Sequence, residues 1–167
     1  VGDSAWLATL WGVVSRAHIL LILVPLGLWR SRHLGFQIGA TWQHWRMLLI
    51  MLLANCGVIA AYLWLTRSST PYSNNQWLVT EVFTVPVVEE TFWRGLVFAV
   101  LLRLLRKGNS ENASNHLAAW LSGIAFGLMH GNNIFAGVPA AFVAIQVLNA
   151  TIWGVVYGYA RAKTGSI

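Results

Sequence analysis

The sequence predicts an all-α fold, a multi-pass bundle of about five transmembrane helices, and three observations lead to that prediction. Hydrophobic residues make up 57% of the 167-residue chain and charged residues only 10%. A soluble domain carries about 45–50% apolar and about 25% charged residues, so this chain has too few charges to cover a water-exposed surface. The apolar residues also occur in long runs, and the basic residues gather between these runs.

Five segments have the length and composition of membrane spans. A hydrocarbon core about 30 Å thick requires roughly 20 mostly apolar residues in a helix. The first segment is interrupted by Ser15, Arg16 and His18. The predicted spans cover about residues 6–29, 45–65, 76–102, 117–135 and 139–160.

Basic residues alternate between the gaps, which predicts the orientation of the spans. The gaps after the second and fourth spans hold only Arg67 between them. We therefore expect the loops near 30–46 and 103–115, and the C-terminal end, to be cytoplasmic. The net charge of +6 then reflects membrane topology, and we expect no nucleic-acid partner. The basic residues of the predicted cytoplasmic side are Arg30, Arg32, Arg46, Arg103, Arg106, Lys107, Arg161 and Lys163.

The chain reads as a single transmembrane domain over residues 1–167, without a second domain or an internal repeat. It begins at Val1 and stops at Ile167 directly after an apolar segment, so we expect it to be truncated at both ends. One cysteine, Cys56, excludes an intrachain disulfide and a thiolate metal site. We expect it to be a small buried side chain.

Ionisable residues gather in the third predicted span, at Glu81, Glu89, Glu90 and Arg94. Each costs at least ~2.5 kcal/mol at the centre of a membrane, so such residues usually mark function. Glu90 and Arg94 stand at i and i+4 and should pair on one helix face. Glu89 lies about 100° around the helix and can point elsewhere. Pro86 removes a backbone donor and should bend the helix.

The fourth predicted span supplies a histidine partner. Phe126 and His130 share a face at i and i+4, and nearby glycines allow a neighbouring helix to approach closely. The third and fourth spans should be antiparallel neighbours that place Glu89 and His130 at similar depth. A carboxylate beside an imidazole can activate water as a general base. A structural polar clamp or a transporter's proton relay would use the same residue types.

At these residues the chain resembles a known family. Glu89-Glu90-Thr-Phe-Trp-Arg94-Gly95 looks like the EExxxR motif of the CAAX protease and bacteriocin-processing (CPBP/Abi) family, and Phe126-Gly-Leu-Met-His130 matches its FxxxH motif. The stretch 154–167 resembles the segment before the family's last motif. These intramembrane endopeptidases are related to type II CAAX prenyl endopeptidases, and the resemblance covers about residues 81–167.

The resemblance implies a role for each motif residue. Glu89 would be the catalytic base and His130 its catalytic partner, supported by Glu90, Arg94 and Phe126. The substrate would be a membrane-associated peptide, including prenylated CAAX-type peptides. A divalent metal such as zinc is a candidate cofactor, with Glu89, Glu90 and His130 as candidate ligands, although catalysis without a metal is also argued for the family.

The family's HxxxN motif, associated with the oxyanion, would begin just after Ile167. We interpret Gln146 and Asn149 as helix-packing groups instead. His33, His44 and His116 are expected to be solvated near interfacial loops, whereas His18 has no clear assignment.

The expected location is a bacterial plasma membrane. The competing hypotheses are a non-catalytic bacteriocin-immunity or scaffold protein and, less favoured, a small transporter. Inverted repeats would favour a transporter, and the sequence shows none.

Overall fold

The computed structural model describes residues 43–66, 84–135 and 137–165, together with Leu10, Val14, Leu21, Val24 and Pro25. These residues form helices and short connections, and no strand occurs among them, which confirms the all-α prediction for the described part. The rest of the first predicted span, the start of the third and the gap between the second and third lie outside the described residues. So do Arg16, His18, Arg30, Arg32, His33, Arg67 and Glu81.

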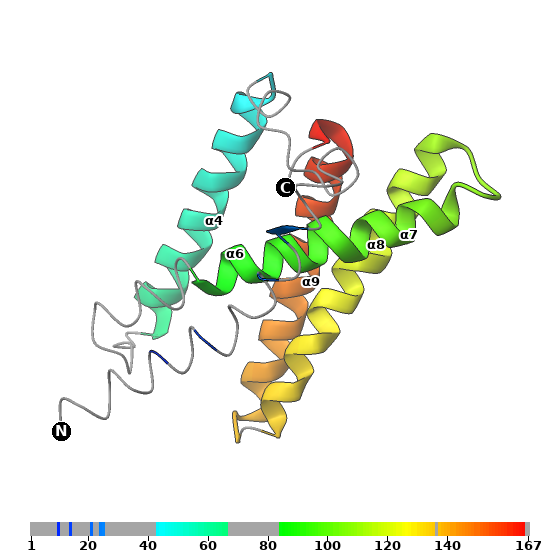
Figure 1. The fold of residues 1–167 in the computed structure, drawn as a ribbon. Coiled ribbons are helices and arrows are strands. Elements are labelled where there is room, and N and C mark those ends of the chain that lie inside the picture. Colours follow the sequence, from blue (N-terminus) through cyan, green and yellow to red (C-terminus); the bar gives the residue numbers. More distant parts are fainter. Residues whose placement is uncertain are drawn as a thin grey trace.

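The described helices follow the chain in a simple order (Figure 1). Helix α4 is separated from the next described helix by residues outside the described part. Helix α6, the π-helix η2 and α7 then follow one another as one continuous helical segment. A short turn leads to α8, whose end tightens into the 3₁₀ helix η3, and α9 completes the described chain. The bounds are Trp45–Thr66 for α4, Val85–Glu90 for α6, Thr91–Val97 for η2, Phe98–Leu105 for α7, Glu111–Met129 for α8, His130–Ile134 for η3 and Ala140–Thr164 for α9.

Helix α8 begins six residues before the predicted start of the fourth span at residue 117. Ser110 stands at the N-cap, where its Oγ accepts a hydrogen bond from the Ala113 N–H at 3.4 Å. Glu111 adds a negative charge to the first turn, which also favours a helix N-terminus. The polar residues that suggested a loop over 111–115 are therefore helical, because capping outweighs their low helix propensity.

By length and composition, one described helix, α9, is long and apolar enough to cross a membrane. Residues Trp45–Val58 of α4 form a shorter apolar helix. The predicted number of spans therefore remains a prediction.

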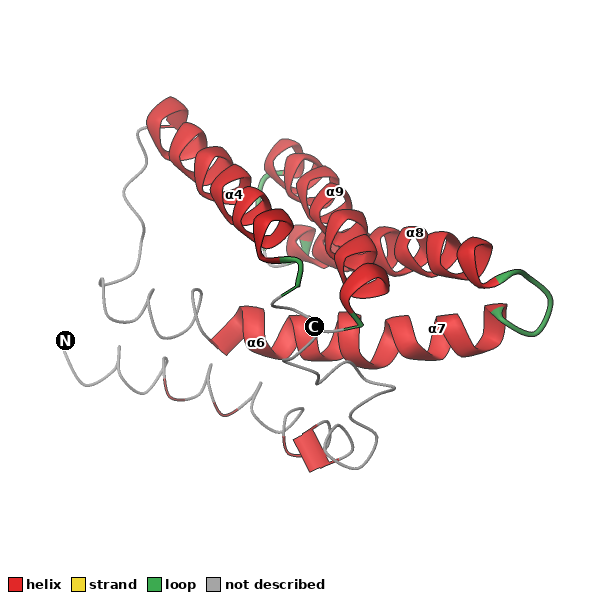
Figure 2. Cartoon of the chain, turned by 90° about the horizontal axis from the view of Figure 1, so that it is seen from above, coloured by secondary structure: helices red, strands yellow, loops and turns green. Residues whose placement is uncertain are grey.

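Helices α8 and α9 lie side by side in both views (Figures 1 and 2) and pack closely through small residues. A Cβ added at Gly123 would lie 2.5 Å from the Val155 nitrogen, and one at Gly127 would lie 2.8 Å from the Val147 carbonyl oxygen. Gly158 approaches Ala119 in the same way, with 2.9 Å to its Cα. The prediction that glycines admit a neighbouring helix is confirmed, and that neighbour is α9.

Helices α7 and α8 form a hairpin, as predicted for the third and fourth spans. Phe98 of α7 packs against Ala118 and Ala119 of α8, all three essentially inaccessible. The Arg106 Nη2 contacts the Glu111 Oε1 at 2.9 Å across the turn. This hairpin positions the first motif of the chain against the second.

The expectations for four single residues meet different outcomes. Gln146 does pack, because its Oε1 accepts a 2.7 Å hydrogen bond from Asn133 Nδ2, whereas Asn149 is exposed. Cys56 was expected to be buried, but it is exposed on α4. His116 is exposed, as expected, although it lies within α8, and its Nδ1 is 2.9 Å from the Tyr159 hydroxyl.

Candidate active site

The predicted ion pair of the first motif is present. The Arg94 Nε lies 3.4 Å from the Glu90 Oε2, with the Arg94 side chain 1% exposed and that of Glu90 33% exposed. A guanidinium so deeply buried needs a counter-charge, because an isolated buried charge is strongly unfavourable. The pairing therefore explains how the helix tolerates Arg94 inside the protein.

The backbone that carries this pair is not a regular α-helix. Thr91–Val97 is π-helical, and the irregular segment begins directly after Glu90. Pro86 lies in the first turn of α6, directly after the segment that holds the π-helical Thr84, and the bend expected there stays a prediction because residues before Thr84 lie outside the described part. The 100° spacing that separates Glu89 from Glu90 therefore does not extend to Arg94. π-Helical turns are rare and often occur at functional sites.

The ring of Phe126 brings the two motifs together. The Arg94 Cζ lies 4.9 Å from the Phe126 ring centroid, and the His130 ring meets the same ring edge-on at 4.9 Å and 85°. Trp93 adds a third contact to the Phe126 ring, edge-on, with 5.7 Å between ring centroids. The face of an aromatic ring attracts a cation, so Phe126 serves as a partner for Arg94 as well as a spacer beside His130.

The hydrogen bond of His130 defines which nitrogen carries the proton. Its Nδ1 is 3.0 Å from the Phe126 carbonyl oxygen. A carbonyl can only accept, so Nδ1–H donates, and in the neutral ring Nε2 is then the acceptor. His130 is half-buried at the point where α8 tightens into η3, so its ring is held by its own helix.

Glu89 is half-buried at the end of α6, next to Glu90. It interacts electrostatically with both Glu90 and Arg94. The described contacts thus join Glu89 to the ion pair and join His130 to Phe126. Within the part of the chain that the structure describes, no three His, Cys, Asp or Glu side chains gather as a metal site. The candidate ligands Glu89, Glu90 and His130 therefore do not form a ready-made set of three.

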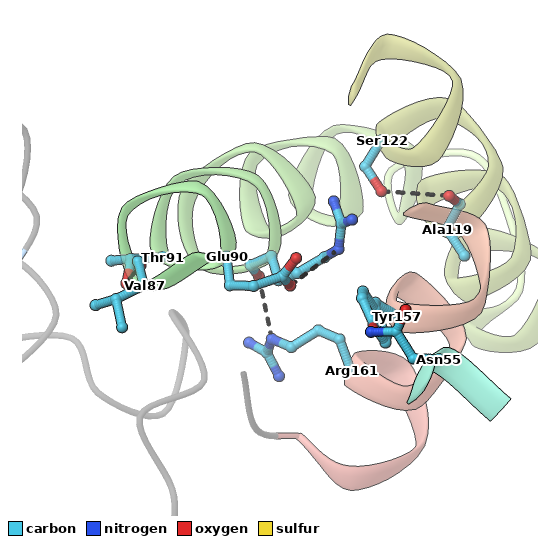
Figure 3. A network of polar contacts seen from close by, with 9 residues as sticks. Asn55, Val87, Glu90, Thr91, Ala119, Ser122, Tyr157 and Arg161 are labelled. Atoms are coloured by element: carbon cyan, nitrogen blue, oxygen red, sulfur yellow. Dashed lines mark hydrogen bonds and ion pairs between the residues drawn. The ribbon is translucent and has the colours of Figure 1, made fainter. Parts of the chain in front are cut away.

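Arg161 lies against the first motif, which its position after the predicted fifth span did not indicate. Helix α9 extends beyond the predicted end at residue 160 to Thr164, before Gly165 ends it with a φ of 70°. Arg161 is 7% exposed, and its Nε–H donates to the Arg94 carbonyl oxygen at 3.3 Å. Figure 3 shows the Arg161 side chain extending from α9 toward the first motif. Its guanidinium also lies 5.7 Å from the Phe98 ring centroid. A basic residue near a span end can thus also be buried against a neighbouring helix.

Two further residues, Tyr157 and Asn55, were missed. Tyr157 projects from α9 beside Glu90 (Figure 3) and interacts electrostatically with Glu90 and Arg94. The Asn55 Nδ2 of α4 donates to the Tyr157 hydroxyl at 3.1 Å. A usable signal existed, because Tyr157 and Arg161 stand at i and i+4 on α9 and so share a helix face.

Residues 71–167 match a family model described as type II CAAX prenyl endopeptidase Rce1-like. No curated protein and no solved structure matches the chain. The match covers more than half of the 167 residues, includes both motifs, and confirms the resemblance to CAAX-processing enzymes. The chain therefore belongs to the Rce1-like family of type II CAAX prenyl endopeptidases, which are membrane-embedded proteases.

Proposed function

We propose that this chain is the single transmembrane domain of a multi-pass intramembrane endopeptidase, in which Glu89 activates a water molecule to hydrolyse a peptide bond. The observation that carries the proposal is that residues of both motifs contact the ring of Phe126. One ring contacts Arg94 of the first motif at 4.9 Å and His130 of the second at 4.9 Å. Two motifs distant in sequence thus share one location, with carboxylates and an imidazole around it.

In the proposed reaction, Glu89 accepts a proton from water as the water oxygen attacks the scissile carbonyl carbon. His130 orients that water, because its Nε2 can accept a hydrogen bond while Nδ1–H is held by the Phe126 carbonyl. When the tetrahedral intermediate collapses, the C–N bond breaks and protonated Glu89 returns its proton to the leaving amine. Glu89 is regenerated as a carboxylate.

Glu90, Arg94 and Phe126 support this chemistry without taking the proton. The ion pair and the Arg94–Phe126 contact keep α6, η2 and α8 in register. No step of the proposed reaction runs through a metal, because the described residues assemble no three-ligand set. The candidate zinc ligands Glu89, Glu90 and His130 therefore enter the mechanism only as base, ion-pair partner and water-orienting imidazole.

The substrate we propose is a peptide anchored in the membrane, including a prenylated CAAX-type peptide. Family membership supports this class. The abundance of exposed apolar side chains on α4, α8 and α9 also suits a protein surrounded by lipid. We propose a bacterial plasma-membrane location with the loops near 30–46 and 103–115 on the cytoplasmic side.

The test is cleavage of a prenylated reporter peptide by the full chain reconstituted in liposomes. Glu89→Gln and His130→Ala should each reduce kcat by about 10²-fold or more, the usual contribution of a positioned acid–base group. The matched controls are Glu111→Gln and His116→Ala, which change an exposed glutamate and an exposed histidine of α8. They should retain cleavage near the wild-type rate. Unchanged cleavage by both site variants would show that the motifs serve packing alone.

A further inference from the structure

Helix α4 contributes one polar side chain to the neighbourhood of the motif residues. Asn55 is half-buried, while Leu52, Leu53 and Val58 around it are exposed apolar residues. An amide inside an apolar helix is unfavourable in a membrane unless it finds a partner, and polar groups there commonly link helices. The partner of Asn55 is the hydroxyl of Tyr157, 102 residues away. Asn55 lies outside the matched range 71–167, so family membership assigns it no role.

The direction of this hydrogen bond determines what Tyr157 can still do. The Asn55 Nδ2 donates at 3.1 Å, so the Tyr157 oxygen accepts. A phenol has one O–H donor in addition to its acceptor capacity, and that hydrogen remains available for another group. Tyr157 interacts electrostatically with Glu90, Arg94 and Cys56, and the Glu90 carboxylate is the strongest hydrogen-bond acceptor of the three. Figure 3 shows Tyr157 on α9 to the right of the Glu90 side chain, with no hydrogen bond drawn between the two.

Among the described residues, the Glu90–Arg94 pair lacks directed hydrogen bonds that would fix its geometry. Its closest contact is 3.4 Å. In the described structure, the Nε, Nη1 and Nη2 atoms of Arg94 have no hydrogen-bond acceptor. The pair is therefore joined by charge and by the Phe126 ring, without the directed bonds that fix an arginine–carboxylate fork. A hydrogen-bond donor to the carboxylate would restrict the Glu90 side chain.

We propose that Tyr157, held in place by Asn55, is a positioning residue that directs its O–H toward Glu90 and so keeps the Glu90–Arg94 pair aligned beside the base Glu89. The proposal rests on the proposed function of the Glu89 site. In this proposal α4 affects catalysis through one hydrogen bond, from Asn55 to Tyr157. Since a positioning group acts on the reacting geometry rather than on substrate affinity, its loss should lower kcat more than it raises KM.

The first experiment compares Tyr157→Phe with Tyr159→Phe in the liposome cleavage assay. Both changes remove one hydroxyl from α9, but the Tyr159 hydroxyl contacts His116 rather than Asn55. Tyr157→Phe should reduce kcat about tenfold, the scale of one hydrogen bond to a charged group, with KM within about twofold. Tyr159→Phe should leave kcat within about twofold. Equal losses from the two variants, or a change confined to KM, would overturn the proposal.

The second experiment tests whether Asn55 acts through Tyr157. Asn55→Ala should reduce kcat less than Tyr157→Phe does, because the ring and its hydroxyl remain. The double variant Asn55→Ala/Tyr157→Phe should have the same kcat as Tyr157→Phe alone, since the hydroxyl that Asn55 orients is already absent. Independent, multiplicative losses would show that Asn55 has a separate effect and would contradict the proposed link.

A third measurement does not depend on activity. The chain has four tyrosines, so tyrosine labelled with ¹³C at Cζ yields few resonances, and that of Tyr157 is assigned by its absence in Tyr157→Phe. This resonance should shift in both Asn55→Ala and Glu90→Gln. A shift with Asn55→Ala alone would refute the contact with Glu90. If the expected shifts occur but Glu89→Gln remains active, the Tyr157 geometry stands and the proposed peptidase mechanism fails.

Discussion

Arg94 shows at the level of one residue how a charge can be accommodated inside this helical protein. Its side chain is 1% exposed, with Glu90 at 3.4 Å and the Phe126 ring at 4.9 Å. Desolvating a cation is expensive, and the partners of a buried pair offset that cost only together. Removing one partner should therefore harm the fold more than removing both.

Glu90→Gln should lower the free energy of unfolding by about 2–3 kcal/mol, toward the lower end for a buried pair because Glu90 is partly exposed. The double variant Glu90→Gln/Arg94→Gln should recover most of this loss, because no uncompensated charge remains. Thermal unfolding in detergent, followed by tryptophan fluorescence, measures both. Glu111→Gln is the matched control, since it breaks an exposed pair with Arg106 and should cost at most about 1 kcal/mol. A double variant as unstable as the single one would show that Arg94 is not stabilised by Glu90.

At the scale of elements, the crossing of α8 and α9 organises the described chain. Gly123 and Gly127 of α8 face Gly154 and Thr151 of α9, so the two backbones come unusually close. Without a hydrophobic driving force between helices in lipid, such close packing supplies much of the attraction. The crossing also places Tyr157 and Arg161 beside the first motif.

Gly123→Ala should destabilise this crossing by about 1–3 kcal/mol, the usual cost of overpacking, because the new Cβ would lie 2.5 Å from a backbone nitrogen of α9. Gly57→Ala is the matched control within α4, where a Cβ meets nothing within 4 Å. There, alanine should be neutral or stabilising by up to about 1 kcal/mol, because it is the better helix former. Equal unfolding temperatures for the two variants would contradict the packing argument.

The elements were largely predictable, but some of their ends and irregularities were not. Helix α4 follows the predicted span over 45–65 almost residue for residue, because a long, mostly apolar run leaves few alternatives. The early start of α8 depended on the Ser110 cap, a local signal that the polar composition obscured. The π segment Thr91–Val97 had no signature in hydrophobic periodicity, since it alters the register of a helix rather than its composition.

At the scale of the whole molecule, the proposed topology places the α7–α8 turn and the α8–α9 connection on opposite sides of the membrane. Asn109 in the first connection and Phe135 in the second are both exposed, and Phe135 is 90% exposed. Each position can therefore report on the side that it faces.

Asn109→Cys and Phe135→Cys, each in a Cys56→Ser background, should react differently with a membrane-impermeant maleimide. In intact cells we expect labelling at position 135 only, and in inside-out vesicles labelling at position 109 only, because basic residues favour the cytoplasmic side. Labelling of both positions from one side would mean that α8 does not cross the membrane, and the multi-pass arrangement would be wrong.

The sequence by itself determined the helical class, the ion pair and the two motifs of this protein. These follow from composition and from residue spacings within one helix. Residues four apart lie on the same side of a helix, so Glu90 pairs with Arg94 and Phe126 contacts His130. Only the tertiary structure decided that Phe126 joins the motifs, that Arg161 is buried against the Arg94 carbonyl, and that Asn55 reaches Tyr157. Those contacts link residues 32 to 102 positions apart, as from Arg94 to Phe126 and from Asn55 to Tyr157. They depend on how closely small residues allow the helices to cross, which no local pattern specifies.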